Sequence, residues 1–179
     1  SEWNQYIQQH LHKHSAKIAY GGYLEVRDIY NRSNLFSSKE NSKERNIHLG
    51  IDFWCNVNTP VLAVLRGKVH SFKDNLGLGN YGPTIILEHN LNSHKFFTLY
   101  GHLSKNSLNN LRVGEIIEQS EEFAEIGNYP DNGDYPPHLH FQIIRDLKGM
   151  SGDFPGVTSL KDRKEDLENC SDPNLILSI

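Results

Sequence analysis

The chain has 179 residues, 37% of them hydrophobic and 22% charged, which is enough for one domain with its own core and is typical of a globular protein. Eighteen basic against 22 acidic residues give a net charge of −4, which argues against a nucleic-acid binder because such proteins need a basic surface. No apolar run approaches the roughly 20 residues of a membrane helix, and no signal-peptide pattern is visible, so we expect no transmembrane segment and leave the localisation unknown.

We divide the chain into three segments. In the first, residues 1–45, apolar side chains recur at helical spacing over residues 2–15, which predicts a short amphipathic helix. An irregular lead-in and a polar loop over residues 31–45 follow the helix. We expect this N-terminal segment to pack on the core.

The second segment, residues 46–150, consists of short β-prone runs separated by turn residues. Many short strands with tight turns predict a mainly β fold, either an antiparallel β sandwich or a partly closed barrel. Arg66 and Gly67 predict a hairpin between the runs at residues 60–65 and 68–72. Asn92 and Ser93 lie in the predicted turn between the runs at residues 84–89 and 95–100. The third segment, residues 151–179, is a tail with a short predicted helix over residues 160–167. Strands are predicted over residues 60–65, 68–72, 84–89, 95–100, 113–118, 123–127 and 138–144.

Cysteine and histidine usage is uneven. Cys55 and Cys170 lie far apart and form no metal-type pair, so either one disulfide or two free thiols is compatible with the sequence. The number of histidines, ten in 179 residues, is the unusual feature of the composition. Three of them, His10, His12 and His14, fall in the predicted helix, where we expect them to face water.

The first motif whose side chains could carry out chemistry runs from His48 to Asp52. An even spacing of four places both side chains on one face if the segment is a continuous strand. An imidazole and a carboxylate on one face can bind the same divalent metal. A single His-x-x-x-Asp pattern is nevertheless more often a solvated face.

The second motif is the predicted strand over residues 138–144. His138, His140 and Gln142 share one face of it, while the apolar residues between them share the other. We therefore expect the apolar face to pack into the core and the histidine face to line a groove. A third motif, Tyr100 to Ser104, places His102 just after an apolar strand.

Taken in chain order, the three motifs at residues 48–52, 100–104 and 138–144 resemble those of the lysostaphin/LytM-type zinc endopeptidases, bacterial enzymes that cut peptide cross-links in peptidoglycan. That family shows His-x-x-x-Asp, then a Gly-His-Leu-Ser-like segment, then His-Leu-His-Phe. The resemblance covers residues 48–144 and includes the sequence between the motifs. It implies a catalytic groove in the β fold and a peptide or peptidoglycan cross-link as the substrate, with no nucleic-acid partner. It also implies a cell-envelope or secreted location, and we expect a monomer.

The resemblance also implies roles for five residues. His48, Asp52 and His140 correspond to the ligands of one zinc ion, and two histidines with one carboxylate leave a position for water, as in catalytic zinc sites. His138 and His102 correspond to the pair that handles protons and stabilises the oxyanion. We favour His138 as the base, and the sequence leaves the division of roles open.

Two departures and two alternatives accompany this interpretation. Residues 133–137 replace the family's usual Ser/Thr-Gly element, and Gln142 stands where the family usually has Glu, so the scissile bond is undetermined. Tyr81 and Tyr100 could line the cleft or simply pack. Two histidines and a carboxylate also form the facial triad of non-haem iron oxygenases. A peptidase-like module that only binds or activates is the other alternative, although such modules typically lose the metal ligands.

Overall fold

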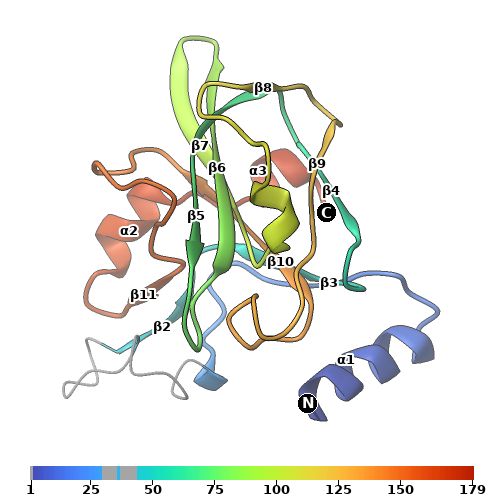
Figure 1. Ribbon diagram of the computed structural model, residues 1–179. Coiled ribbons are helices and arrows are strands. Elements are labelled where there is room, and N and C mark those ends of the chain that lie inside the picture. Colours follow the sequence, from blue (N-terminus) through green and yellow to red (C-terminus); the bar gives the residue numbers. More distant parts are fainter. Residues whose placement is uncertain (1, 30–35, 37–43) are drawn as a thin grey trace.

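The computed structural model describes residues 2–29, 36 and 44–179, and a seven-stranded antiparallel sheet forms its centre (Figure 1). Two small antiparallel sheets of two strands each complete the β structure, which confirms the predicted mainly β fold. In sheet order, the large sheet contains β1 (Ala19–Gly21), β3 (Ile51–Trp54), β10 (His138–Ile144), β7 (His94–Gly101), β6 (Gly82–Leu91), β5 (Gly67–Asn75) and β8 (Ile116–Ile117). The small sheets pair β11 (Val157–Ser159) with β2 (Arg45–His48) and β4 (Pro60–Leu62) with β9 (Glu122–Glu125).

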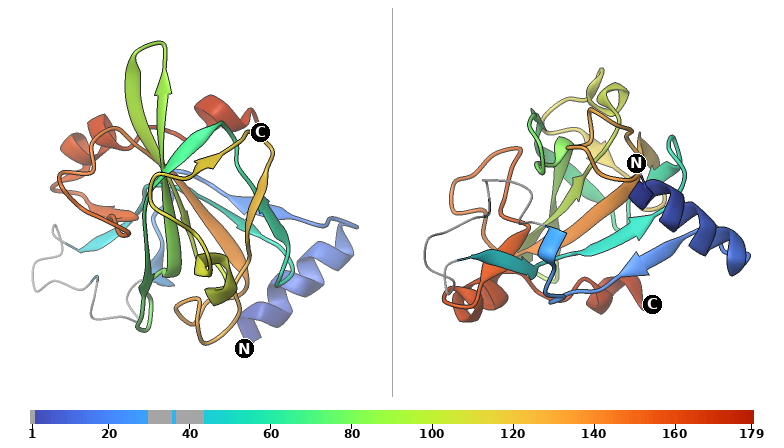
Figure 2. Two further views of the ribbon diagram at one scale, coloured as in Figure 1. Left: turned by 45° about the horizontal axis from the view of Figure 1, so that its top comes forward. Right: turned by 90° about the horizontal axis from the view of Figure 1, so that it is seen from below.

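Helices are short and lie around the β structure. In the described part of the chain they include α1 (Glu2–Lys13), a 3-10 helix (Lys105–Leu108), α2 (Arg163–Asn169) and α3 (Asn174–Leu177). Figure 2 shows α1 and α2 on opposite sides of the molecule. Throughout the described part of the chain, every helix is too short or too polar to span a lipid bilayer.

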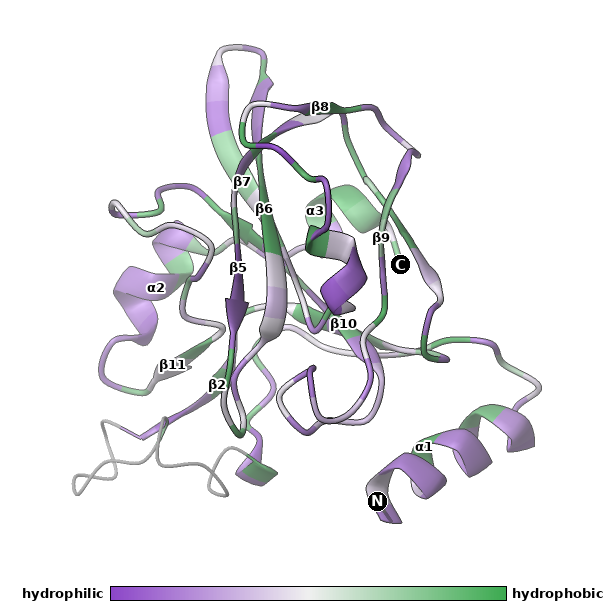
Figure 3. Cartoon of the chain, in the orientation of Figure 1, coloured by the Kyte–Doolittle hydropathy of each residue, from purple (hydrophilic) through white to green (hydrophobic). Residues whose placement is uncertain are grey.

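The main core lies on one face of the large sheet, against β4 and β9. Alternation along each strand sends Ile85 and Leu87 of β6, Tyr100 of β7 and Phe141 of β10 to this face, and all four are buried. Figure 3 shows the hydrophobic residues gathered in the central strands, whereas α1 is largely hydrophilic. His10 and His12 of α1 and His14 just after it are exposed, as expected.

The opposite face of the sheet carries a second, smaller core under the C-terminal segment. Ile86, Leu99 and Ile144 lie on this face and pack with Phe154 and Cys170. His138, His140 and Gln142 point to this same face and are also buried. The strand alternation predicted for residues 138–144 therefore agrees with the structure, and His138 and His140 line a cavity on this face.

Turn chemistry explains the longest hairpin. Asn92 and Ser93 join β6 to β7, and both have left-handed backbone conformations, with φ of 50° and 65°. Two consecutive residues with positive φ form the turn type that suits a two-residue β-hairpin, and asparagine tolerates this conformation well. This connection agrees with the sequence prediction.

Two local predictions are wrong. The expected hairpin through Arg66 and Gly67 does not form, because β4 pairs with β9 and β5 pairs with β6 and β8. The continuous strand expected over residues 48–52 is broken into β2 and β3. In both cases strand pairing with partners distant in the sequence outweighs the local pattern. Most of the predicted polar loop over residues 31–45 lies outside the described residues.

Candidate metal centre

The break between β2 and β3 brings His48 and Asp52 together. In a continuous strand, four residues would separate their Cα atoms by about 13 Å, too far for both side chains to bind one ion. His48 instead ends β2, Leu49 and Gly50 turn the chain, and Asp52 is the second residue of β3. His48 Nε2 lies 3.2 Å from Asp52 Oδ1. The expected proximity holds, but a turn produces it.

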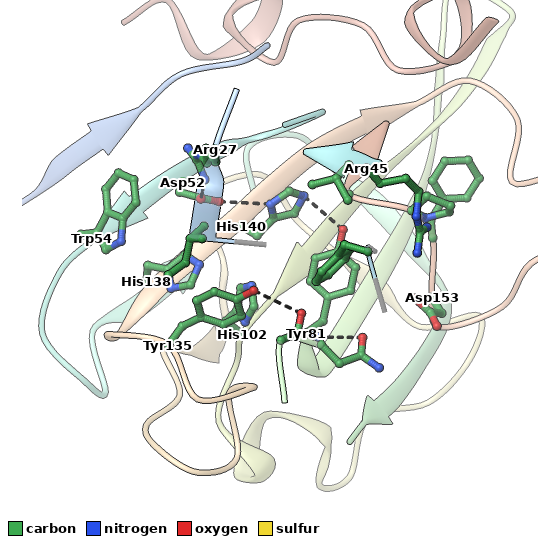
Figure 4. Close-up of a pocket in the computed structure, with 18 of the residues that line it drawn as sticks. Arg27, Arg45, Asp52, Trp54, Tyr81, His102, Tyr135, His138, His140 and Asp153 are labelled. Carbon is green, nitrogen blue, oxygen red and sulfur yellow. Dashed lines mark hydrogen bonds and ion pairs between the residues drawn. The ribbon is translucent and has the colours of Figure 1, made fainter. Parts of the chain in front are cut away.

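β10 supplies the third member of the cluster. His140 pairs across the sheet with Asp52 on β3 and with Gly101 on β7. Its Nδ1 lies 3.1 Å from Asp52 Oδ1 and 2.9 Å from His48 Nε2. Figure 4 shows His140 between Asp52 and Tyr81 in the middle of the site. Each of the three residues thus offers a ligand atom within 4.8 Å of the others.

Hydrogen bonds on the outer side of each ring orient the two imidazoles. His48 Nδ1 lies 3.2 Å from the carbonyl oxygen of Gly22, and His140 Nε2 lies 3.0 Å from Gln142 Oε1. Both partners are oxygen acceptors, so these ring nitrogens donate, and the tautomers follow from that network. The nitrogens that face each other across 2.9 Å therefore both carry lone pairs. Two lone pairs beside a carboxylate oxygen repel each other unless a cation lies among them, so this donor set fits a divalent metal.

Charge and burial favour, for Asp52 and His48, the ionisation states that metal ligands require. Burial alone would raise the pKa of Asp52, but His48 and the Arg27 guanidinium hold it well below its usual range. Arg27 Nη1 donates to Asp52 Oδ2, on the far side of the carboxylate from the histidines. Burial lowers the pKa of His48, against the opposing effect of Asp52. The cluster thus combines an ionised carboxylate with neutral imidazole.

His102 and His138 form a second pair beside this cluster. His102 follows the end of β7 with a left-handed φ of 62°, a conformation that non-glycine residues seldom adopt outside turns and functional sites. Its ring centroid lies 4.1 Å from that of His138. His102 Nδ1 donates to the Asn132 carbonyl and His138 Nδ1 to the Pro136 carbonyl, each over 2.8 Å. Both rings therefore keep Nε2 as the acceptor nitrogen.

The same pair is neutral in the folded chain. Burial lowers the pKa of His138 to about 4 and that of His102 well below its ordinary value, because desolvation disfavours the charged imidazolium. A neutral imidazole with an available lone pair can accept a proton from water. The structure therefore brings all five predicted site residues together, in two groups with different surroundings.

A cavity of about 810 Å³ gives access to these groups. Its walls come from four parts of the chain: the β core, helix α1, the lead-in before β2 and the segment before β11. From the core it exposes Asp52 and His140 of the metal cluster together with the histidine pair, and from the flanks it includes Arg27 and residues 150, 151 and 153–157. Core residues on its walls include Asp52, Trp54, Tyr81, His102, Tyr135, His138 and His140.

Tyr81 and Tyr100 differ in their surroundings. Tyr81 lines the cavity, and its hydroxyl lies 3.4 Å from His140 Nε2. Tyr100 is fully buried in the main core, where its ring packs against Phe123 and Phe141 at centroid distances of 4.9 and 5.2 Å. Of the two candidates, therefore, only Tyr81 belongs to the site.

Two glycines let the chain close around His140. A Cβ on Gly50 would lie 2.6 Å from His140 Cε1, closer than real side chains approach. A Cβ on Gly156 would overlap the Tyr81 hydroxyl and would lie 3.3 Å from His140 Cε1. The imidazole of His140 is thus held between two backbone segments that have no side chains there.

Sequence reasoning missed Arg27 and gave Gln142 no role. No motif marks Arg27, which lies 21 residues before His48 and meets Asp52 only through tertiary structure. Gln142 fixes His140, and its amide nitrogen donates to the Pro155 carbonyl and to Cys170 Sγ over 3.1 and 3.3 Å. Its position two residues after His140 on the same strand face was the available signal. Cys55 and Cys170 are both free and buried, so the disulfide alternative is excluded.

Comparisons with known proteins agree with this geometry. The peptidase family M23 profile matches residues 46–151, which include all five site residues. Lysostaphin of Staphylococcus staphylolyticus is 37% identical over 98 residues, which are 54% of this chain and 18% of that protein. Glycyl-glycine endopeptidase ALE-1 of Staphylococcus capitis is 38% identical over 97 residues, or 53% of this chain and 24% of that protein. The chain thus spans about a fifth of the length of these curated relatives.

The fold is also similar to that of a solved domain. The catalytic domain of lysostaphin from Staphylococcus simulans superposes with a TM-score of 0.55 over 96% of this chain and 97% of that domain, at 24% sequence identity. At this identity the likeness concerns the fold. It extends to the flanks outside residues 46–151, which the family profile does not cover.

Proposed function

The chain belongs to peptidase family M23, and from that membership we propose that it is a zinc-dependent endopeptidase that hydrolyses peptides or peptidoglycan cross-links. The single observation that carries the proposal is the convergence of His48 Nε2, His140 Nδ1 and Asp52 Oδ1. Outer hydrogen bonds leave the two nitrogens unprotonated toward each other, which suits a cation and not an empty polar cluster.

Zinc is the metal that these ligands suit best. Two histidines and one carboxylate are the protein ligands of catalytic zinc sites that keep a position for water. When bound, zinc supplies Lewis acidity and lowers the pKa of its water to about 7. We assign one zinc ion to His48, Asp52 and His140.

The histidine pair moves the proton in this proposal. Nε2 of His138 accepts a proton from the attacking water and returns it to the leaving amine, so that no net proton is gained or lost. His102, 4.1 Å away between ring centroids, takes up a proton at Nε2 from bulk water before the attack, donates that N–H to the oxyanion as a hydrogen bond and keeps the proton at the end, so the step stays balanced. The Asn132 and Pro136 carbonyls keep both rings oriented through these changes.

The substrate class rests on the relatives. Lysostaphin and a glycyl-glycine endopeptidase match this chain over about half its length, which supports a peptide substrate and suggests a cell-wall cross-link. We keep a monomer as the expected state.

Metal analysis together with digestion tests the proposal. Protein purified without added metal should contain one zinc per chain, and a chelator should abolish activity that added zinc restores. Purified cross-linked peptidoglycan and blocked synthetic peptides are the substrates, and mass analysis identifies the released fragments. His140→Ala serves as the inactive control. Stoichiometric iron with oxygen-dependent turnover would replace zinc hydrolysis with oxygenase chemistry, and full zinc occupancy without cleavage of any substrate would indicate a binding module.

A further inference from the structure

An aromatic wall stands beside the histidine pair on one side of the cavity. It consists of Trp3, Trp54 and Tyr135, which all line the cavity. The ring centroid of Tyr135 lies 5.5 Å from that of His138. Trp54 stacks on the other side of that histidine, with a centroid distance of 6.0 Å and an interplanar angle of 22°. Trp3 extends the wall with an edge contact to Tyr135 at 6.0 Å. Figure 4 shows Trp54 and Tyr135 on either side of His138.

The wall is built before any ligand arrives. The Tyr135 hydroxyl donates to the Gly79 carbonyl over 3.2 Å, which fixes its ring. Trp54 lies under the Arg27 guanidinium at 5.7 Å from the ring centroid. Ring pairs at these distances attract each other, and a preformed surface loses little conformational freedom on binding. The wall therefore needs no rearrangement to receive an apolar group.

From this geometry we propose that the aromatic wall is a substrate subsite for a bulky apolar or aromatic side chain next to the scissile peptide bond. The inference rests on the proposed function, in which His138 contacts the reacting groups. Neighbouring residues of an extended peptide are about 3.3 Å apart along the chain, so a side chain adjacent to the scissile bond reaches rings 5–6 Å from His138.

Charge and volume support an apolar occupant. The three side chains of the wall carry no charge, and the nearby Arg27 is paired with both Glu25 and Asp52. A cavity of about 810 Å³ has the size of pockets that enclose drug-sized ligands. A glycine residue has no side chain to place against three aromatic rings, so an oligoglycine substrate would leave this surface unused.

Part of the wall comes from outside the region shared with the family. Trp3 belongs to α1, whereas the family profile covers residues 46–151. The glycyl-glycine specificity in the name of one relative therefore does not determine what this subsite takes. The preference therefore depends in part on this chain's N-terminal flank.

The chain contains two tryptophans, and both are in the wall, so intrinsic tryptophan fluorescence reports on it directly. Zinc-loaded protein is titrated with N-acetyl-leucinamide, N-acetyl-phenylalaninamide and N-acetylglycinamide, which contain no peptide bond between amino acids. The two apolar amides should bind about 10–100-fold more tightly than the glycine amide, the gain expected for burying one large side chain. Equal binding of all three would overturn the subsite.

Turnover gives a second measurement on the same protein. Blocked hexaglycine is compared with peptides in which one glycine at a time is replaced by leucine, phenylalanine or lysine. One position next to the cut should raise kcat/KM about 10–100-fold for leucine or phenylalanine and not for lysine. Trp3→Ala should bring this ratio down toward 1. Tyr6→Ala is the matched control, because Tyr6 is an exposed aromatic residue on the same helix that does not line the cavity.

The outcomes separate the two proposals. Cleavage of hexaglycine and of every substituted peptide at the same rate would overturn the subsite and leave the peptidase intact. Absence of cleavage, with the amide preference retained and lost in Trp3→Ala, would overturn the peptidase and leave the subsite. A ratio that falls equally in Trp3→Ala and Tyr6→Ala would assign the effect to α1 as a whole and overturn the wall.

Discussion

The β core and the flanking segments contribute different things to the same site. Every side chain to which we assign chemistry lies between His48 and His140, inside the region that the family profile matches. Outer contacts of the metal cluster come largely from the flanks: the Gly22 carbonyl on His48, Arg27 on Asp52 and Gly156 beside His140. In the proposed reaction the core therefore supplies the reacting groups, while the flanks orient the candidate metal ligands and contribute to the walls of the cavity.

The largest effects should follow removal of a ligand from the core. His48→Ala, Asp52→Ala and His140→Ala each delete one of only three protein contacts to the metal, so each should lose both zinc and turnover. Zinc content and hydrolysis are measured on the same preparations, with circular dichroism to verify folding. If His138→Ala loses zinc while His140→Ala retains it, the two histidines are assigned the wrong way round.

The second histidine pair should behave differently although it belongs to the same core. His102→Ala and His138→Ala should keep one zinc per chain, because neither residue is in the metal cluster. The rate should fall about 10²–10⁴-fold, the range for loss of a general acid–base group. Single-turnover kinetics on zinc-verified protein measures this loss. Unchanged rates in both variants would place proton transfer elsewhere.

Replacement of Arg27 tests whether a flank supports a core ligand. Arg27→Gln removes the group that holds Asp52 Oδ2, and zinc affinity should weaken about 10–100-fold, as for other residues that orient metal ligands. Competition with a zinc chelator measures the Kd. Arg27→Lys should recover part of the loss, since it restores the charge but not the planar fork. Arg66→Gln is the control, because Arg66 is an exposed arginine in a surface ion pair. Equal Kd values for Arg27→Gln and the wild type would show that Asp52 is positioned by the core alone.

The smallest effect should come from the tail. In Gly156→Ala the new Cβ overlaps the Tyr81 hydroxyl, and such overpacking typically lowers the free energy of unfolding by about 1–3 kcal/mol. Urea denaturation measures the change. Adding Tyr81→Phe removes the overlapping oxygen and should recover part of the loss. Strictly additive losses in the double variant would show that the two residues do not interact.

Much of the β core follows from local patterns. The period of two over residues 138–144 predicted β10 and the face of each of its side chains, because one face of that strand packs into the main core. Asn92 and Ser93 marked the β6–β7 turn, since two residues with positive φ suit such a hairpin. The helical spacing near the N-terminus predicted α1 to within two residues.

The candidate site residues, their order and the strand face on which they lie could be predicted from the sequence alone, because side-chain alternation and turn preferences act between near neighbours. Three features emerge only in the folded chain: the pairing of β4 with β9, the turn at Leu49 and Gly50 that brings His48 to Asp52, and the contact of Arg27 with that carboxylate. These features join residues whose partners are set by the packing of separate strands, and a short window of sequence carries no record of such contacts. The candidate site residues of the core could therefore be predicted from the sequence, whereas the contacts that the flanks make with the site could be identified only in the folded chain.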